Sequence, residues 1–99
     1  ETLAVKQTFN GNALSIPSSS TKSMVGHPQG ASGALGVTVS ALSLKNGFMT
    51  PTINMETPDP ECDMDYISNV GREKRMDIAI SNCISFGSKN SSIVLKRFE

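Results

Sequence analysis

The sequence has no tryptophan, one tyrosine, one histidine and two cysteines among its 99 residues. It also lacks any excess of charge, because nine Lys and Arg balance nine Asp and Glu. Without a basic excess there is no electrostatic reason to expect nucleic acid or an acidic membrane surface as a partner. No stretch reaches the roughly 18 consecutive apolar residues that a membrane-spanning helix needs. These absences exclude a basic-groove binder and predict no transmembrane segment.

Cofactor and metal signatures are also missing. Cys62 and Cys83 have no second cysteine pair and no histidine at zinc spacing, so we expect no metal site. No signal-peptide pattern precedes them, which favours a reducing compartment and predicts a cytoplasmic protein. Asp59, Asp63 and Asp65 resemble a calcium loop in composition alone and are interpreted as solvated turn residues. Neither a phosphate-binding loop nor a dinucleotide fingerprint is present, and we predict no cofactor.

The charges that do occur are unevenly distributed. Lys22 is the only charged residue between Lys6 and Lys45, whereas Glu56–Arg75 contains nine. A free domain with this pattern would have an unusually apolar surface rich in Ser and Gly. One interpretation is a soluble segment with many hydroxyl groups. We favour the other, in which residues 7–44 lie inside a larger body.

A segment of small residues follows the histidine. Gly30, Gly33 and Gly36 recur every three residues, so one side of this segment has almost no side chains. Glycine costs about 0.5–1 kcal/mol relative to alanine in a helix interior, and close packing must compensate. We predict a buried Gly/Ala-rich helix over residues 30–44 that is packed on a mixed sheet and stopped by Asn46-Gly47. The small side would admit another helix or a substrate channel.

The remaining elements are short. Residues 1–9 read as a helix already in progress at Glu1, which predicts that the chain belongs to something longer. An Asn-Gly turn signal at residues 10–11 ends that helix. We predict strands at residues 14–17, 64–67, 76–80 and 92–95, with a long Ser-, Gly- and Asn-rich loop over residues 81–91. This order is typical of an α/β layer without an internal boundary.

The single histidine, His27, lies five residues after Lys22 and directly before the glycine-rich segment. A neutral imidazole has one donor and one acceptor nitrogen, which suits it to binding an oxyanion or passing a proton. A lone histidine is more often structural than catalytic. Its place before a helix N-terminus, where anions are favoured, leaves both interpretations open.

The same residues carry a resemblance to a known family. The string Ser19-Ser-Thr-Lys-Ser-Met-Val-Gly-His27, followed by Gly30-Ala-Ser-Gly-Ala34, resembles the Lys/His motif of β-ketoacyl-acyl carrier protein synthases. The resemblance continues in register through Pro51–Asn54, Asp63–Tyr66 with Asn69 and Arg72, and Asn82–Gly87 with Asn90. It covers residues 1–99, which look like the last quarter of an elongating ketosynthase. The resemblance therefore implies an acyltransferase of fatty acid biosynthesis with a partial thiolase-like α/β fold.

The resemblance also implies roles for individual residues. Enzymes of this family load an acyl chain onto a cysteine, decarboxylate malonyl-carrier protein and join the resulting carbanion to the acyl thioester. His27 matches the second active-site histidine, which stabilises the enolate as it forms. Lys22 matches the lysine that supports this constellation, and Phe86 matches the gating phenylalanine at the acyl tunnel. The gate positions beside it are Ile84, Ser85 and Gly87.

Two departures from the family pattern stand out. The family usually has Gly-Phe-Gly-Gly-Thr-Asn at the gate, where this chain has Ser85-Phe-Gly-Ser-Lys-Asn90 and an Ile84 in place of a common phenylalanine. Less glycine predicts a stiffer gate. Many members also have a glutamate nine residues after the histidine to partner the lysine, where this chain has Gly36.

The resemblance places the nucleophilic cysteine and the first histidine before Glu1, and neither Cys62 nor Cys83 matches them. We therefore expect the 99-residue chain alone to be inactive, because catalytic groups that act as a unit fail together. The alternatives are a chain-length-factor-like or polyketide ketosynthase subunit that lacks or relocates the nucleophile, and a purely structural assembly module.

The implied partners are acyl carrier protein, the N-terminal part of the same protein and, when full length, a second copy in a homodimer. Five scattered basic residues could dock an acidic carrier protein, although a solvated face explains scattered charges more simply. They are Lys45, Lys74, Arg75, Lys96 and Arg97.

Overall fold

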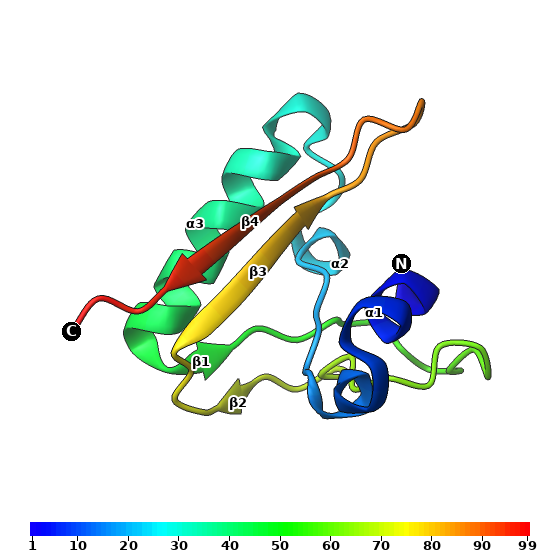
Figure 1. Ribbon diagram of the computed structural model, residues 1–99, viewed down its shortest axis with the longest axis horizontal. Helices are drawn as coiled ribbons and strands as arrows, with labels where there is room; N and C mark the ends of the chain where they lie inside the picture. The colour runs from blue at the N-terminus through cyan, green and yellow to red at the C-terminus, as the bar shows by residue number, and fades with distance from the viewer.

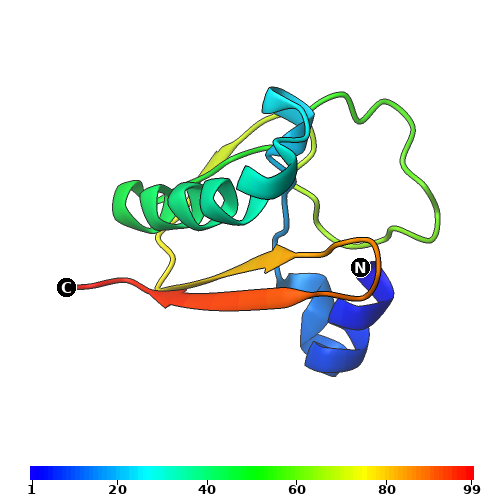
Figure 2. The same cartoon turned by 90° about the horizontal axis from the view of Figure 1, so that it is seen from above.

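The longest element is α3 (Ser32–Asn46), which packs against an antiparallel hairpin of β3 (Ile78–Cys83) and β4 (Ser91–Lys96). These elements come from a computed structural model that describes residues 1–99. Figure 1 shows α3 lying along the hairpin, and Figure 2 shows that it covers one face and leaves the other open along most of its length. No helix has the length and apolar character needed to cross a membrane.

The predicted helix is confirmed, with its end where the sequence placed it. It follows a 3₁₀ turn, η2 (Gln29–Ala31), and stops at Gly47, whose φ of 64° is the left-handed conformation that favours glycine. The amide of Gly47 donates to the carbonyl of Ser43 at 2.9 Å and so satisfies one carbonyl of the last turn. Asn46-Gly47 therefore acts as the stop signal.

The glycines of α3 bring the helix close to β3. A Cβ atom added to Gly36 would lie 2.5 Å from Ser81 Oγ, and one added to Gly33 would lie 3.9 Å from Cys83 Sγ. The close approach is confirmed, but the neighbour is a strand and not the helix or substrate channel that we predicted. A side chain at position 36 would therefore require the Ser81 hydroxyl to turn away.

Two further details of the predicted architecture are wrong for this chain. The helix is not buried, because β3, β4 and the short strand β1 (Phe48–Met49) contact one side of it and Leu44 is its only buried residue. The sheet is not mixed, because both two-stranded ladders are antiparallel and a single Thr52–Ser68 bridge is parallel. The loop of seven residues between β3 and β4 is too short for the crossover that parallel strands need.

The hairpin begins later than its apolar residues predict. The strand expected at 76–80 runs from Ile78 to Cys83, and the strand expected at 92–95 is confirmed within β4. The ladder continues into the polar segment because Asn82 pairs with Ser92, whose hydroxyl donates to the Asn82 side-chain oxygen at 2.7 Å. The loop is accordingly shorter than the predicted 81–91.

The second layer contains short elements. They are α1 (Thr2–Phe9), η1 (Asn10–Ser15), α2 (Lys22–Val25), β1 (Phe48–Met49) and β2 (Arg72–Glu73). The predicted first helix is confirmed as α1, which ends at Asn10 with a positive φ of 48°. The five buried residues are Ala13, Leu44, Met49, Met64 and Ile67.

Two predicted strands do not form. Residues 14 and 15 are the end of η1, which Ser15 stabilises by donating its hydroxyl to the Asn12 carbonyl at 2.8 Å. Residues 64–67 turn instead of extending, because the Asp65 carboxylate accepts the amide of Ile67 at 3.1 Å and Ile67 has a φ of 50°. In both segments a local side-chain hydrogen bond competes successfully with strand pairing.

Much apolar surface remains uncovered. The accessible area is 7211 Å², against about 5,400 Å² for a folded monomer of this mass. On the face of the hairpin away from α3, Ile78 is 60% exposed, Ile80 43% and Val94 65%. A patch of this kind marks an interaction surface.

We predict that Asp65 contributes stability that acid removes. Arg72 donates to both carboxylate oxygens of Asp65, at 2.5 and 2.6 Å, and this hydrogen bond holds the pKa of Asp65 below its usual range. A carboxylate with a lowered folded-state pKa stabilises the fold above its unfolded pKa, and the contribution disappears as the pH falls from about 4 through the lowered value. Asp65→Asn should therefore flatten the loss of thermal stability over that range. An acid profile identical to that of the parent protein would contradict the prediction.

Candidate active site

The segment that carries Lys22 and His27 is held in place by hydroxyl groups. The amide of Ser20 donates to Thr52 Oγ1 at 2.9 Å, and the amide of Ile53 donates to Ser23 Oγ at 3.0 Å. These two hydrogen bonds tie the residues on either side of Lys22 to an extended segment thirty residues away in the sequence. The hydroxyls of Ser23 and Thr52 therefore have a positional role.

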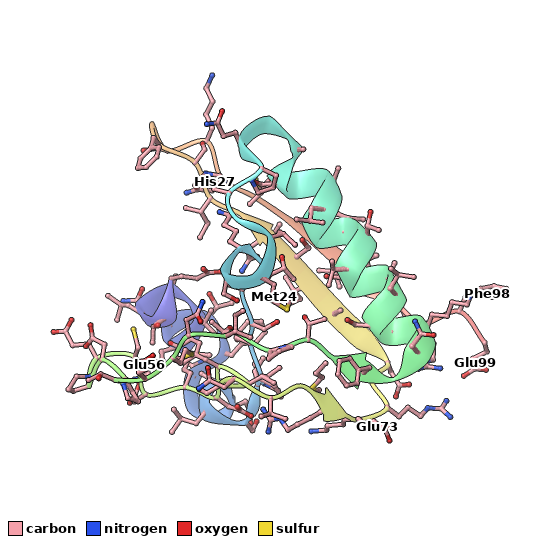
Figure 3. All side chains as sticks on the ribbon, turned by 180° about the vertical axis from the view of Figure 1, so that it is seen from behind. Met24, His27, Glu56, Glu73, Phe98 and Glu99 are labelled. Atoms are coloured by element: carbon pink, nitrogen blue, oxygen red, sulfur yellow. The ribbon has the colours of Figure 1, made fainter.

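His27 lies on the short connection between α2 and α3 (Figure 3). Gly26, with a φ of 78°, turns the chain out of α2. The imidazole is exposed, and its Nδ1 lies 3.2 Å from the Gln29 amide nitrogen and 3.2 Å from Ser32 Oγ. Both partners are hydrogen-bond donors from the start of η2 and α3. They leave the other ring nitrogen, Nε2, without a protein partner.

Lys22 begins α2 and is exposed. The three ion pairs in the structure join Lys6 to Asp63, Arg72 to Asp65 and Arg75 to Asp77. Lys22 takes part in none of them, so its ammonium group is available to a partner outside this chain.

The predicted gate is the loop between β3 and β4. Phe86 is fully exposed, and Gly87 and Ser88 both have positive φ values, of 85° and 64°. Two hydrogen bonds close the base of the loop: Ser85 Oγ donates to the Lys89 carbonyl at 2.7 Å, and the Ser85 amide donates to Asn90 Oδ1 at 3.3 Å. Ile84, at the start of the loop, is 54% exposed.

The fold brings the histidine and the gate loop to the same end of the molecule. Cys83, which precedes Ile84, packs against Gly33 in the first turn of α3, six residues after His27. Figure 1 shows the hairpin running along α3, with its tip extending beyond the N-terminal end of the helix. Residues about sixty positions apart in the sequence thus lie at the same end of α3.

A separate cavity of about 310 Å³ lies beside α1, between Ser18–Ser20 and the Met64–Tyr66 segment. None of the six predicted site residues lines it. Cys62 does, and its thiol is 3.8 Å from the Thr2 hydroxyl, whereas Cys83 lies under α3. Both cysteines are free thiols.

Four of the five scattered basic residues lie at the opposite end of α3. The Lys74 carbonyl, the Arg75 Cα and the Arg97 guanidinium all lie within 4.0 Å of a Cβ added to Gly47, and Lys45 is in the last turn of the helix. Arg97 donates to the carbonyls of Leu44 and Met76. This end lies about 22 Å from the His27 end, from the rise of a 15-residue helix.

Comparison with known proteins then identifies the family. The family profile described as β-ketoacyl synthase, C-terminal domain, matches residues 1–56, more than half of the chain. The chain belongs to the β-ketoacyl synthase family. The resemblance seen in the Lys/His motif is thereby confirmed.

Curated synthases align along nearly the whole chain. The 3-oxoacyl-(acyl-carrier-protein) synthase 2 of Coxiella burnetii is 44% identical over 97 residues, which are 98% of this chain and 23% of that protein. The tetracenomycin polyketide synthase ketoacyl synthase alpha subunit of Streptomyces glaucescens is 46% identical over 97 residues, which are again 98% of this chain and 23% of that protein. The chain thus spans about a quarter of the length of these relatives.

Solved ketosynthases share the fold. The ishigamide ketosynthase/chain length factor matches all of this chain and 24% of its own, with a TM-score of 0.94 and 30% identity. The AntDE:AntF structure, a type II polyketide acyl-carrier protein in complex with its ketosynthase bound to the hexaketide, matches 97% of this chain and 24% of its own. Its TM-score is 0.89, at 35% identity. The partial thiolase-like α/β fold class is confirmed.

Sequence reasoning missed some of the residues that build the site. It found His27, Lys22 and the gate by their motif, but not Ser32, Ser23 or Thr52. A hydroxyl five residues after the histidine was visible in the sequence as the Ser of Gly30-Ala-Ser-Gly33. Its contact with the imidazole depends on the turn through η2, which the sequence did not predict.

Proposed function

We propose that residues 1–99 are the C-terminal part of a 3-oxoacyl-(acyl-carrier-protein) synthase. The complete protein would condense malonyl-carrier protein with an acyl-enzyme thioester in fatty acid biosynthesis, with loss of CO₂. The observation that carries this proposal is His27, whose Nδ1 accepts hydrogen bonds and whose Nε2 has no protein partner. Alignment along the whole chain to synthases named for this reaction supports it.

The proposed chemistry follows from that geometry. The bond between the malonyl methylene and its carboxylate breaks, CO₂ leaves, and the electron pair moves onto the thioester carbonyl as an enolate. The Nε2–H of His27 donates to the enolate oxygen as its charge develops, which lowers the barrier. The carbanion then attacks the acyl thioester, and the cysteine thiolate of the N-terminal part departs. Lys22 supports the charge of this constellation, and Phe86 gates the acyl tunnel together with Ile84, Ser85 and Gly87.

The proposed partners follow from the same function. The uncovered hairpin face and the excess surface area support packing against the N-terminal part of the same protein. Acyl carrier protein delivers both substrates, and the basic residues near Gly47, which are Lys45, Lys74, Arg75 and Arg97, are proposed to dock it. The complete synthase is proposed to be a cytoplasmic homodimer, and the two free thiols support the reducing location.

A polyketide role is the second candidate. The Streptomyces relative at 46% identity and the AntDE:AntF structure are polyketide systems by their names, and the ishigamide structure is named as a ketosynthase/chain length factor. A ketosynthase of that pathway would use the same histidine. A chain-length-factor-like subunit would keep this part of the fold but lack the nucleophile.

The test is an assay of the complete protein with malonyl- and acyl-carrier protein. We expect release of CO₂ and a 3-oxoacyl product two carbons longer than a saturated primer. Repeated extension without reduction would favour the polyketide role, and CO₂ release without carbon–carbon bond formation would favour the chain-length-factor-like role. No reaction of either kind would contradict the proposed function. The 99-residue chain alone should be inactive, and condensation by it would contradict our assignment of essential groups to the N-terminal part.

A further inference from the structure

The neighbours of His27 identify which ring nitrogen carries the proton. The backbone amide of Gln29, 3.2 Å from Nδ1, is a donor with no lone pair to offer. Nδ1 must therefore be the acceptor, and in the neutral ring the proton lies on Nε2. That tautomer presents an N–H group outward from the chain.

A second donor converges on the same atom. The Ser32 hydroxyl lies 3.2 Å from Nδ1 and has no other hydrogen-bond partner in the structure. Ser32 belongs to the first turn of α3, yet its side chain does not cap the helix. The usual structural explanation for a serine at a helix start therefore does not apply here.

We infer that Ser32 is a positioning residue for His27. Its hydroxyl helps to hold the imidazole as the Nε2–H tautomer, with that N–H aimed at the substrate oxygen. This inference rests on the proposed function. The Gln29 amide sets the acceptor role of Nδ1 through the backbone, and the Ser32 hydroxyl adds a second hydrogen bond that a side-chain substitution can remove. Because α3 is anchored to β3 at Gly33 and Gly36, the hydroxyl is held by a rigid element.

The experiment compares Ser32→Ala, Ser32→Thr and His27→Ala in the complete synthase, with Ser40→Ala as a matched control further along the same helix. The activity readout is CO₂ release from malonyl-carrier protein. We expect Ser32→Ala to lower kcat about 2- to 10-fold, the value of one neutral hydrogen bond, with KM unchanged. Ser32→Thr, which keeps the hydroxyl, should restore most of the rate. Ser40→Ala should match the parent protein.

A spectroscopic readout separates positioning from packing. With ¹⁵N-labelled histidine, the signals lost in His27→Ala identify the His27 ring nitrogens, and their shifts report the tautomer. We expect Ser32→Ala to shift the Nδ1 signal, because that nitrogen loses one of its two donors, and Ser32→Thr to retain the shift of the parent protein. The inference would be overturned if Ser32→Ala left both kcat and the ¹⁵N shifts of His27 unchanged. It would also be overturned if Ser32→Ala and Ser32→Thr lost kcat equally and both had a lower melting temperature. If His27→Ala leaves CO₂ release unchanged, the proposed function is wrong. If His27→Ala slows CO₂ release but Ser32→Ala does not, only the inference about Ser32 is wrong.

Discussion

His27→Ala is expected to slow malonyl decarboxylation by the complete synthase about 10²- to 10³-fold, the effect of removing one preorganised donor to a developing oxyanion. The loss should appear mainly in kcat, because the Nε2–H strengthens its hydrogen bond as the enolate forms. Steady-state CO₂ release at saturating malonyl-carrier protein measures it.

The fold should tolerate this substitution. His27 is exposed, and its two hydrogen bonds join it to residues two and five positions away. The melting temperature should therefore stay close to that of the parent protein. His27→Gln, which keeps a side-chain N–H donor, serves as the matched variant and should recover part of the rate. Unchanged decarboxylation by a stable His27→Ala protein would show that the histidine is structural.

Gly71→Ala is expected to destabilise the protein by roughly 1–3 kcal/mol, the range for steric overpacking. An added Cβ would lie 2.8 Å from the Met49 carbonyl oxygen and would also overlap the Phe48 ring. The carbonyl cannot withdraw easily, because Met49 pairs with Arg72 in the β1–β2 ladder. The ladder itself would have to shift.

Urea denaturation of the parent protein and the variant measures this effect. Gly11→Ala is the matched control, because a Cβ there meets nothing within 4 Å. It should change the free energy of unfolding by no more than about 0.5 kcal/mol. Equal unfolding midpoints for Gly71→Ala and Gly11→Ala would show that the β1–β2 contact yields at little cost.

The elements predicted correctly are those with a strong local signal. Residues 1–9 and the glycine-rich segment form helices, and each helix ends at an Asn-Gly pair as expected. Residues 92–95 lie within β4, where an apolar run has an equally long partner. In these segments local preference and tertiary packing favour the same conformation.

The wrong predictions fall where a side chain competes with the backbone. The Asp65 carboxylate accepts the Ile67 amide and turns a segment whose alternation predicted a strand. In the opposite direction, Asn82 and Ser92 extend the hairpin into residues that composition assigned to a loop. The pattern of apolar residues along the sequence does not predict such hydrogen bonds, because each one requires a donor and an acceptor to lie close together in the folded chain.

The sequence by itself determined the family and the glycine-rich helix, and it singled out His27, Lys22 and Phe86 as candidate site residues, because a motif is a contiguous string that can be read directly. Tertiary structure decided that β3 is the neighbour of the glycines and that the loop after β3 lies at the same end of α3 as the histidine. It also placed the Ser32 hydroxyl beside Nδ1. The first two outcomes depend on the close approach of α3 and β3, and the third depends on the turn at η2, which brings the Ser32 hydroxyl within hydrogen-bond range of the imidazole.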